Sequence, residues 1–105
     1  MSLHKIQDLI KTNHAVALKF SAEWCGPCHT VAPLYSKYAE EHKDVLVIPL
    51  DIDVDHKVAS FFSITAVPTF LFYKHGKLVS TVRGADRVAI KNGFSRVSSA
   101  YPMDP

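Results

Sequence analysis

The sequence predicts an α/β domain in which a central mixed sheet is flanked by helices. Apolar residues at helical spacing alternate along the chain with short β-rich runs. Their order is helix, strand, helix, strand, helix, strand, strand, helix, which favours right-handed crossovers in an α/β sheet. His75-Gly76 fits a tight turn between the last two strands, so these should pair antiparallel. The sheet should therefore be mixed.

The first element is an amphipathic helix. Ser2 can cap it, because a serine hydroxyl accepts a hydrogen bond from a free amide of the first turn. Its apolar residues recur at helical spacing: Leu3, Ile6, Leu9 and Ile10. The helix should end near Asn13, and a strand should follow from Ala15 to Phe20.

A second helix follows the segment Glu-Trp-Cys-Gly-Pro-Cys at residues 23–28. Its apolar face consists of Val31, Leu34, Tyr35 and Tyr38. Pro33 should kink this helix, since proline lacks an amide hydrogen and its ring crowds the preceding turn. A strand from Val45 to about Asp51 begins with a nearly continuous apolar run, which is typical of a strand covered on both faces.

The rest of the chain predicts two helices and the hairpin strands. Asp55 can cap a short helix that carries Val58, Ala59 and Phe62. The strands should run from Thr69 to Tyr73 and from Leu78 to Arg83. Asp86 can cap a last helix whose inward residues are Ile90, Phe94 and Val97. Residues 101–105 contain two prolines and should form a loose tail.

Length and composition favour one globular domain over residues 1–105. The chain has 48% hydrophobic and 21% charged residues, and a net charge of only +2. Without a Lys/Arg run, this charge argues against nucleic acid as a partner. No apolar run approaches the roughly 18 residues of a membrane span. The first five residues lack the apolar stretch of a signal peptide, so we expect a cytoplasmic protein, and a monomer.

Two cysteines, Cys25 and Cys28, stand where a strand runs into a helix. Two intervening residues bring the sulfurs within bonding reach. Free amides and the helix dipole favour the thiolate at the first sulfur, and only a thiolate attacks a disulfide. Cys25 should therefore be the nucleophile and the more exposed thiol. Cys28, one turn into the helix, should be the less exposed, resolving thiol.

The neighbours of the cysteines suit this redox interpretation. Pro27 fits a helix start because the amide that it lacks would be unpaired there. Trp24 can shield the site from water. Val67-Pro68-Thr69 opens a strand, and Pro68 can adopt either a cis or a trans peptide bond.

Three other interpretations of the cysteines remain open. They could be two buried free thiols. With His29 they match the c-type haem attachment pattern, which would need a mainly helical, exported chain and Met103 as axial ligand. They could also bind zinc with a histidine and a fourth ligand. The strand-to-helix context favours redox chemistry, and we expect neither a metal nor another cofactor.

The segment Ala-Glu-Trp-Cys-Gly-Pro-Cys at residues 22–28 resembles the active-site motif of the thioredoxin family. Other family positions match as well: Pro33, the acidic stretch at 51–55, the cis-proline segment at 67–70, Gly76, and Gly84-Ala85. The resemblance extends from the first helix to the last. It implies the thioredoxin fold, although the N-terminus is about seven residues short. We therefore expect four strands, with the family's first strand missing and the strand at 45–51 at a sheet edge. Pro49 suits an edge, because proline cannot donate to the ladder.

The resemblance also implies an enzyme, a protein disulfide reductase. Cys25 would attack a substrate disulfide, Cys28 would resolve the mixed disulfide, and a reductase or a low-molecular-weight dithiol would restore the dithiol. This implies a role in electron transport and cell redox homeostasis, with disulfide-containing proteins as substrates. The matching docking surface is Trp24, Gly26, Pro27, Val67, Pro68, Gly84 and Ala85. Val67 would pair its backbone with an extended substrate. The other functions considered are a thioredoxin-fold adaptor module and a disulfide donor.

Two charged residues depart from the family pattern. Lys19 occupies the position of a buried aspartate below the active site, and Pro49 replaces the charged residue often found near it. Lys19 could act as a general base, stabilise a thiolate, or extend its ammonium into water. Arg83 stands before Gly84, where the family surface is often apolar or small; it could simply be a solvated charge at a strand end.

Overall fold

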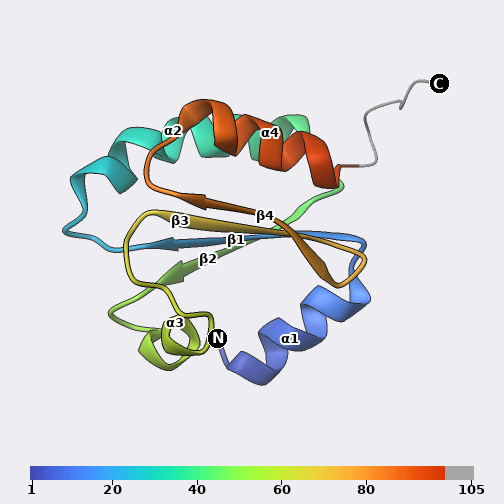
Figure 1. Ribbon diagram of the computed structural model, residues 1–105, viewed down its shortest axis with the longest axis horizontal. Coiled ribbons are helices and arrows are strands. Elements are labelled where there is room, and N and C mark those ends of the chain that lie inside the picture. Colours follow the sequence, from blue (N-terminus) through green and yellow to red (C-terminus); the bar gives the residue numbers. More distant parts are fainter. Residues whose placement is uncertain (99–105) are drawn as a thin grey trace.

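The computed structural model describes residues 1–98, which form a three-layer α/β fold (Figure 1). The elements are α1 (Leu3–Thr12), β1 (Ala15–Ser21), α2 (Gly26–Glu41), β2 (Leu46–Asp51), α3 (His56–Phe61), β3 (Thr69–Lys74), β4 (Lys77–Arg83) and α4 (Arg87–Val97). Their order is the predicted one. The tail expected at 101–105 lies outside the described residues.

The described strands form one mixed sheet in the order β2-β1-β3-β4. β1 pairs with β2 in parallel, whereas β3 is antiparallel to both β1 and β4. This confirms the four strands and the edge position of β2. The register pairs Phe20 with Thr69 and Thr69 with Arg83. The carboxyl ends of β1, β2 and β4 therefore lie beside the start of β3, at one end of the sheet.

Helices cover both faces of the sheet. In Figure 1, α2 and α4 lie on one side, and α1 and α3 on the other. The alternation of β1 separates two cores, because successive side chains of a strand point to opposite faces. Ala15 and Ala17 pack in the core that includes Val31 of α2. Leu18 and Phe20 pack in the core that includes Ile6 of α1.

The predicted helix caps are confirmed at two of three positions. The Ser2 hydroxyl accepts from the Lys5 amide at 3.1 Å, and the Asp86 carboxylate accepts from the Ala89 amide at 3.0 Å. Asp55 precedes α3 but makes no side-chain cap. Its carboxylate instead accepts from the N-terminal ammonium of Met1 at 3.2 Å and from the Asp51 amide at 3.3 Å. The expected cap was wrong because these other donors occupy the carboxylate.

The predicted hairpin turn is also confirmed. His75 and Gly76 both have positive φ, 52° and 79°, as a type I′ turn requires. Pro33 lies inside α2, which continues beyond it to Glu41. The kink expected there remains a prediction. Within residues 1–98, no helix is long and apolar enough to cross a bilayer.

Candidate active site

Cys25 and Cys28 form a disulfide where β1 leads into α2, with their Cα atoms 5.3 Å apart. Cys25 is the N-cap of α2, and its Sγ accepts a hydrogen bond from the Cys28 amide at 3.2 Å. Pro27 occupies the first turn, where its missing amide hydrogen leaves no donor unpaired. The amino end of α2 therefore points its dipole and an amide at the Cys25 sulfur, as expected for a thiolate site.

The two cysteines are equally exposed, at 4% each. The expectation that Cys25 would be the more exposed is wrong for this oxidised form. The disulfide joins the two sulfurs, and the pair packs in one cluster with Ala22, Ile52 and Val67. The sequence did not single out Ile52, because only the tertiary fold brings the loop after β2 to the cysteines.

The segment before β3 completes the apolar part of the site. The Val67–Pro68 peptide bond is cis, and Val67 packs against the cysteine cluster. The Gly84 amide donates to the Pro68 carbonyl at 2.8 Å, which ties the end of β4 to this segment. Gly84 has a φ of 94°, which favours glycine. Gly26, Pro27 and Ala85 are exposed, whereas Pro68 is buried.

Trp24 is on the surface beside the disulfide, with 68% of its area exposed. Its indole Nε1 donates to a carboxylate oxygen of Asp53 at 2.8 Å. The Asp53 amide in turn donates to the Asp51 carboxylate at 2.8 Å. The acidic stretch after β2 thus holds the tryptophan. Asp53 is a site residue that sequence reasoning did not assign, although this stretch was noted.

Lys19 lines a hollow of about 170 Å³ together with Cys28. It follows Ala15 and Ala17 on the α2 side of the sheet, and its Nζ lies 5.2 Å from the centroid of the Tyr35 ring. Burial lowers the pKa of Lys19, because the charged form loses hydration. Its β2 neighbour in the register is Pro49, which has no charge to offer. Lys19 and Cys28 therefore border the same hollow, which Glu23 and Asp51 also line.

The fold contradicts the haem interpretation, which required a mainly helical chain. The His29 ring nitrogen Nε2 lies 2.6 Å from the Glu23 carbonyl oxygen, a contact that orients the ring toward the backbone. Met103 lies outside the described residues. Within residues 1–98, no three His, Cys, Asp or Glu side chains group so as to hold a metal ion. The disulfide contradicts the interpretation of two free thiols.

Comparison with known proteins agrees with this geometry. The family model described as Thioredoxin matches residues 4–95. The chain is 41% identical over 80 residues to Thioredoxin-2 of Saccharomyces cerevisiae, covering 76% of this chain and 77% of that protein. It is 40% identical over 90 residues to the TPR repeat-containing thioredoxin TDX of Arabidopsis thaliana, covering 86% of this chain but only 24% of that longer protein. The crystal structure of oxidised mitochondrial thioredoxin 3 from S. cerevisiae is similar with a TM-score of 0.85 and 33% identity, covering 90% of this chain and 89% of the other.

Proposed function

The chain belongs to the thioredoxin family, and we propose that it reduces protein disulfides with the Cys25–Cys28 pair. Members of this family are thiol–disulfide oxidoreductases, and the paired cysteines are those of such an enzyme. One observation carries the proposal: a dithiol that closes to a disulfide stands at the amino end of a helix, packed against the segment with the cis proline.

The reaction begins with the thiolate of Cys25. The amide of Cys28 and the helix dipole favour the negative charge on this sulfur. The thiolate attacks one sulfur of the substrate disulfide, whose S–S bond breaks as the mixed disulfide forms. The departing substrate sulfur leaves as a thiolate and takes up a proton.

Cys28 completes the reaction. Its thiolate attacks the Cys25 sulfur of the mixed disulfide, so the intermolecular bond breaks and the Cys25–Cys28 disulfide forms. The substrate has then gained two electrons and the enzyme has lost two. A dithiol donor, or a reductase that delivers two electrons, returns the enzyme to the reduced form.

The apolar surface beside the disulfide would hold the substrate. Val67 packs at the cysteines, and its backbone would pair with an extended substrate segment. The other contacts in this proposal come from Trp24, Gly26, Pro27, Pro68, Gly84 and Ala85. Trp24 would stand at the acidic end of this surface, where Asp53 holds its indole.

Lys19 takes the place of the family's buried acid in this proposal. Its position in the hollow with Cys28 supports an electrostatic role, because a nearby cation favours ionisation of a thiol. The ammonium would thus help Cys28 to form the thiolate that resolves the mixed disulfide. In this proposal, attraction by a cation replaces the transfer of the thiol proton to a buried carboxylate.

We further propose protein disulfides as substrates, a reductase as the electron donor, and work in cell redox homeostasis. A reducing role requires a compartment in which thiols are kept reduced. We propose the cytoplasm, although a similar structure belongs to a mitochondrial thioredoxin. Microscopy of the tagged full-length protein beside a mitochondrial marker tests this location.

Two matched variants test the mechanism. Cys28→Ser should accumulate a mixed disulfide with substrate, because attack proceeds but resolution does not. Cys25→Ser should form no such adduct and should not reduce insulin in the presence of dithiothreitol. The adducts are measured by non-reducing electrophoresis and mass spectrometry. Normal turnover by Cys28→Ser would contradict the assignment, as would adducts formed mainly by Cys25→Ser.

The same assays separate the other candidate functions. An adaptor module would bind its partners equally well in the wild type and in a double cysteine variant, without reducing insulin. A disulfide donor would stay largely reduced in a glutathione buffer that leaves a reducing thioredoxin oxidised, since a donor has the higher reduction potential. We expect this protein to remain oxidised in that glutathione buffer, as a reducing thioredoxin does.

A further inference from the structure

At the end of the sheet next to the disulfide, acidic side chains lie on one side and a basic side chain lies on the other. At this end, paired residues form a row across the four strands, from Asp51 on β2 through β1 and Thr69 on β3 to Arg83 on β4. Three strand spacings separate the ends of this row, a distance of about 14 Å. The acidic stretch lies at one end, where Asp53 binds Trp24. Arg83 lies at the other end, so a substrate that crosses the disulfide meets charges of opposite sign.

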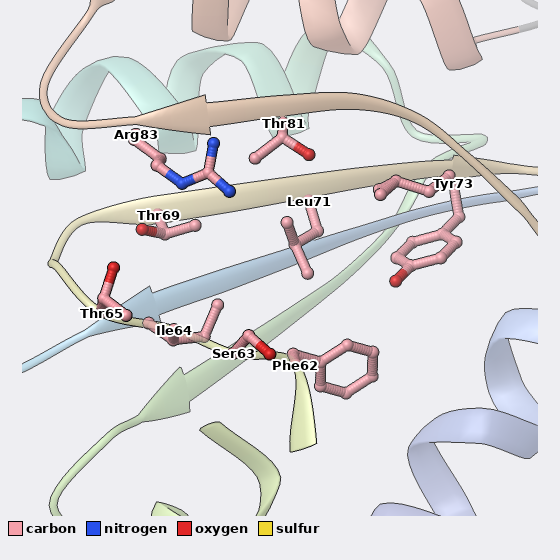
Figure 2. Close-up of a pocket in the computed structure, with 10 residues that line it drawn as sticks. Phe62, Ser63, Ile64, Thr65, Thr69, Leu71, Tyr73, Thr81 and Arg83 are labelled. Carbon is pink, nitrogen blue, oxygen red and sulfur yellow. The ribbon is translucent and has the colours of Figure 1, made fainter. Parts of the chain in front are cut away.

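Arg83 borders a hollow of about 140 Å³ that the proposed reaction does not use. The hollow lies between β3, β4 and the segment at 62–65 that follows α3 (Figure 2). Figure 2 shows the guanidinium extended along the strands, between Thr69 and Thr81. Hydroxyl side chains supply most of the polar lining, and Arg83 is its charged member. No ion pair to Arg83 is formed within residues 1–98.

This hollow adjoins the segment that would hold the substrate. Thr69, which lines it, directly follows Pro68, and Gly84, next to Arg83, binds the Pro68 carbonyl. In an extended substrate segment, side chains on one side recur every two residues, about 7 Å apart. The register places Arg83 two strand spacings, about 10 Å, from the end of β1, which leads to Cys25. The substrate side chain that matches this separation is two or three residues from the substrate cysteine, about 7–10 Å along the extended segment.

We propose that Arg83 is a specificity-determining residue that pairs with a carboxylate of the substrate, two or three residues from the disulfide that is reduced. This inference rests on the proposed reductase function. A guanidinium presents paired donors that match the two oxygens of a carboxylate. The hydroxyls around it suit a polar side chain, and no acidic side chain among the lining residues competes for the charge. The occupant is thus an aspartate or glutamate of an extended substrate segment.

Three disulfide-bonded peptides test the proposal, identical except for Asp, Ser or Lys at the position two residues from the cysteine. The readout is kcat/KM for each peptide with reduced enzyme, at low and high ionic strength. The wild type should prefer the Asp peptide over the Lys peptide by about two- to fivefold, the range of one exposed ion pair. The preference should shrink in high salt, because salt screens exposed charges.

Variants then assign the preference to Arg83. Arg83→Glu should reverse the order of the Asp and Lys peptides, whereas Arg83→Lys should keep it. Lys77→Glu is the matched control, since it makes the same change of charge at the other end of β4. An unchanged Asp-to-Lys ratio in Arg83→Glu would overturn the proposal. An equal shift in Lys77→Glu would also overturn it, by showing that net charge alone acts. Failure to reduce even the Ser peptide would instead overturn the reductase function on which the proposal rests.

Discussion

At the scale of single residues, Lys19, which lines the hollow with Cys28, is packed against a buried tyrosine. The Lys19 ammonium lies over the Tyr35 ring, where the negative face of an aromatic ring attracts a cation. Burial raises the pKa of the Tyr35 hydroxyl well above its usual range, so the tyrosine remains neutral. Within residues 1–98 this hydroxyl has no hydrogen-bond partner. Tyr35 therefore adds no charge of its own beside the Lys19 ammonium, and we propose that this ammonium acts on Cys28 across the hollow that both residues line.

A pH series on Lys19 variants tests this assignment. Lys19→Met should slow the resolving step at neutral pH and move the acid limb of the profile to higher pH, because the Cys28 thiolate loses an attractive charge. Lys19→Asp should move it further in the same direction, since it adds repulsion. The measurement is stopped-flow decay of the mixed disulfide from pH 5 to 9. Superimposable profiles for wild type and Lys19→Met would show that the ammonium merely extends into water.

The lowered pKa of Lys19 also predicts a change in stability. Between its folded-state pKa and the unfolded value of 10.5, the unfolded chain binds more protons than the folded one. Stability therefore rises with pH in this window. Lys19→Met removes this dependence, so it should be more stable than the wild type at neutral pH, with a difference that shrinks as the pH approaches 10.5. Urea unfolding from pH 7 to 10.5 measures this, and a constant difference would contradict it.

At the scale of elements, local signals predicted the helices and strands better than their contacts. Asp86 caps α4 as expected, because its role depends only on amides in the next turn. Asp55 does not cap α3, because donors from outside that helix occupy its carboxylate. The sequence also did not indicate Gly93 as a packing residue. A Cβ there would overlap the Phe72 ring, so this glycine lets α4 approach β3, a requirement that only the tertiary structure reveals.

The Asp86 cap has a measurable contribution to stability. Asp86→Ala should lower the free energy of unfolding by about 1 kcal/mol, because the Ala89 amide loses its acceptor. Asp86→Asn keeps a side-chain oxygen and should remain close to the wild type. Thermal and urea unfolding followed by circular dichroism give both values. Equal losses in the two variants would assign the effect to the charge of Asp86 and contradict the cap.

At the scale of the whole molecule, the site is assembled from segments far apart in the chain. The sequence motifs predicted that Cys25, Pro68 and Gly84 belong to one site, because they matched positions of a known family. The contacts of Asp53 with Trp24 and of Ile52 with the cysteines were not predictable, since they depend on how the loop after β2 packs. Arg83 could be noted only as a departure. Its place beside the hollow became visible once the register of β3 and β4 was known.

The shared sheet also bears on how the molecule unfolds. One core lies on the α2 and α4 side and the other on the α1 and α3 side, and alternate residues of β1 contribute to both. Neither core can lose its packing while the other retains an intact sheet, because the same strands form the floor of each. We propose that residues 1–98 form a single cooperative domain, as the length of the chain suggests.

Two core variants on opposite faces test this proposal. Leu18→Ala empties space in the core beside α1, and Phe94→Ala does so in the core beside α4. Each should destabilise the protein by about 2–5 kcal/mol, the usual range for such buried truncations. Circular dichroism reports on the helices, and fluorescence of Trp24 reports on the site. In a cooperative domain, each variant shifts the urea midpoints of both probes equally, because one transition unfolds both cores. Separate midpoints, with Phe94→Ala affecting one probe and Leu18→Ala the other, would show that the two faces unfold independently.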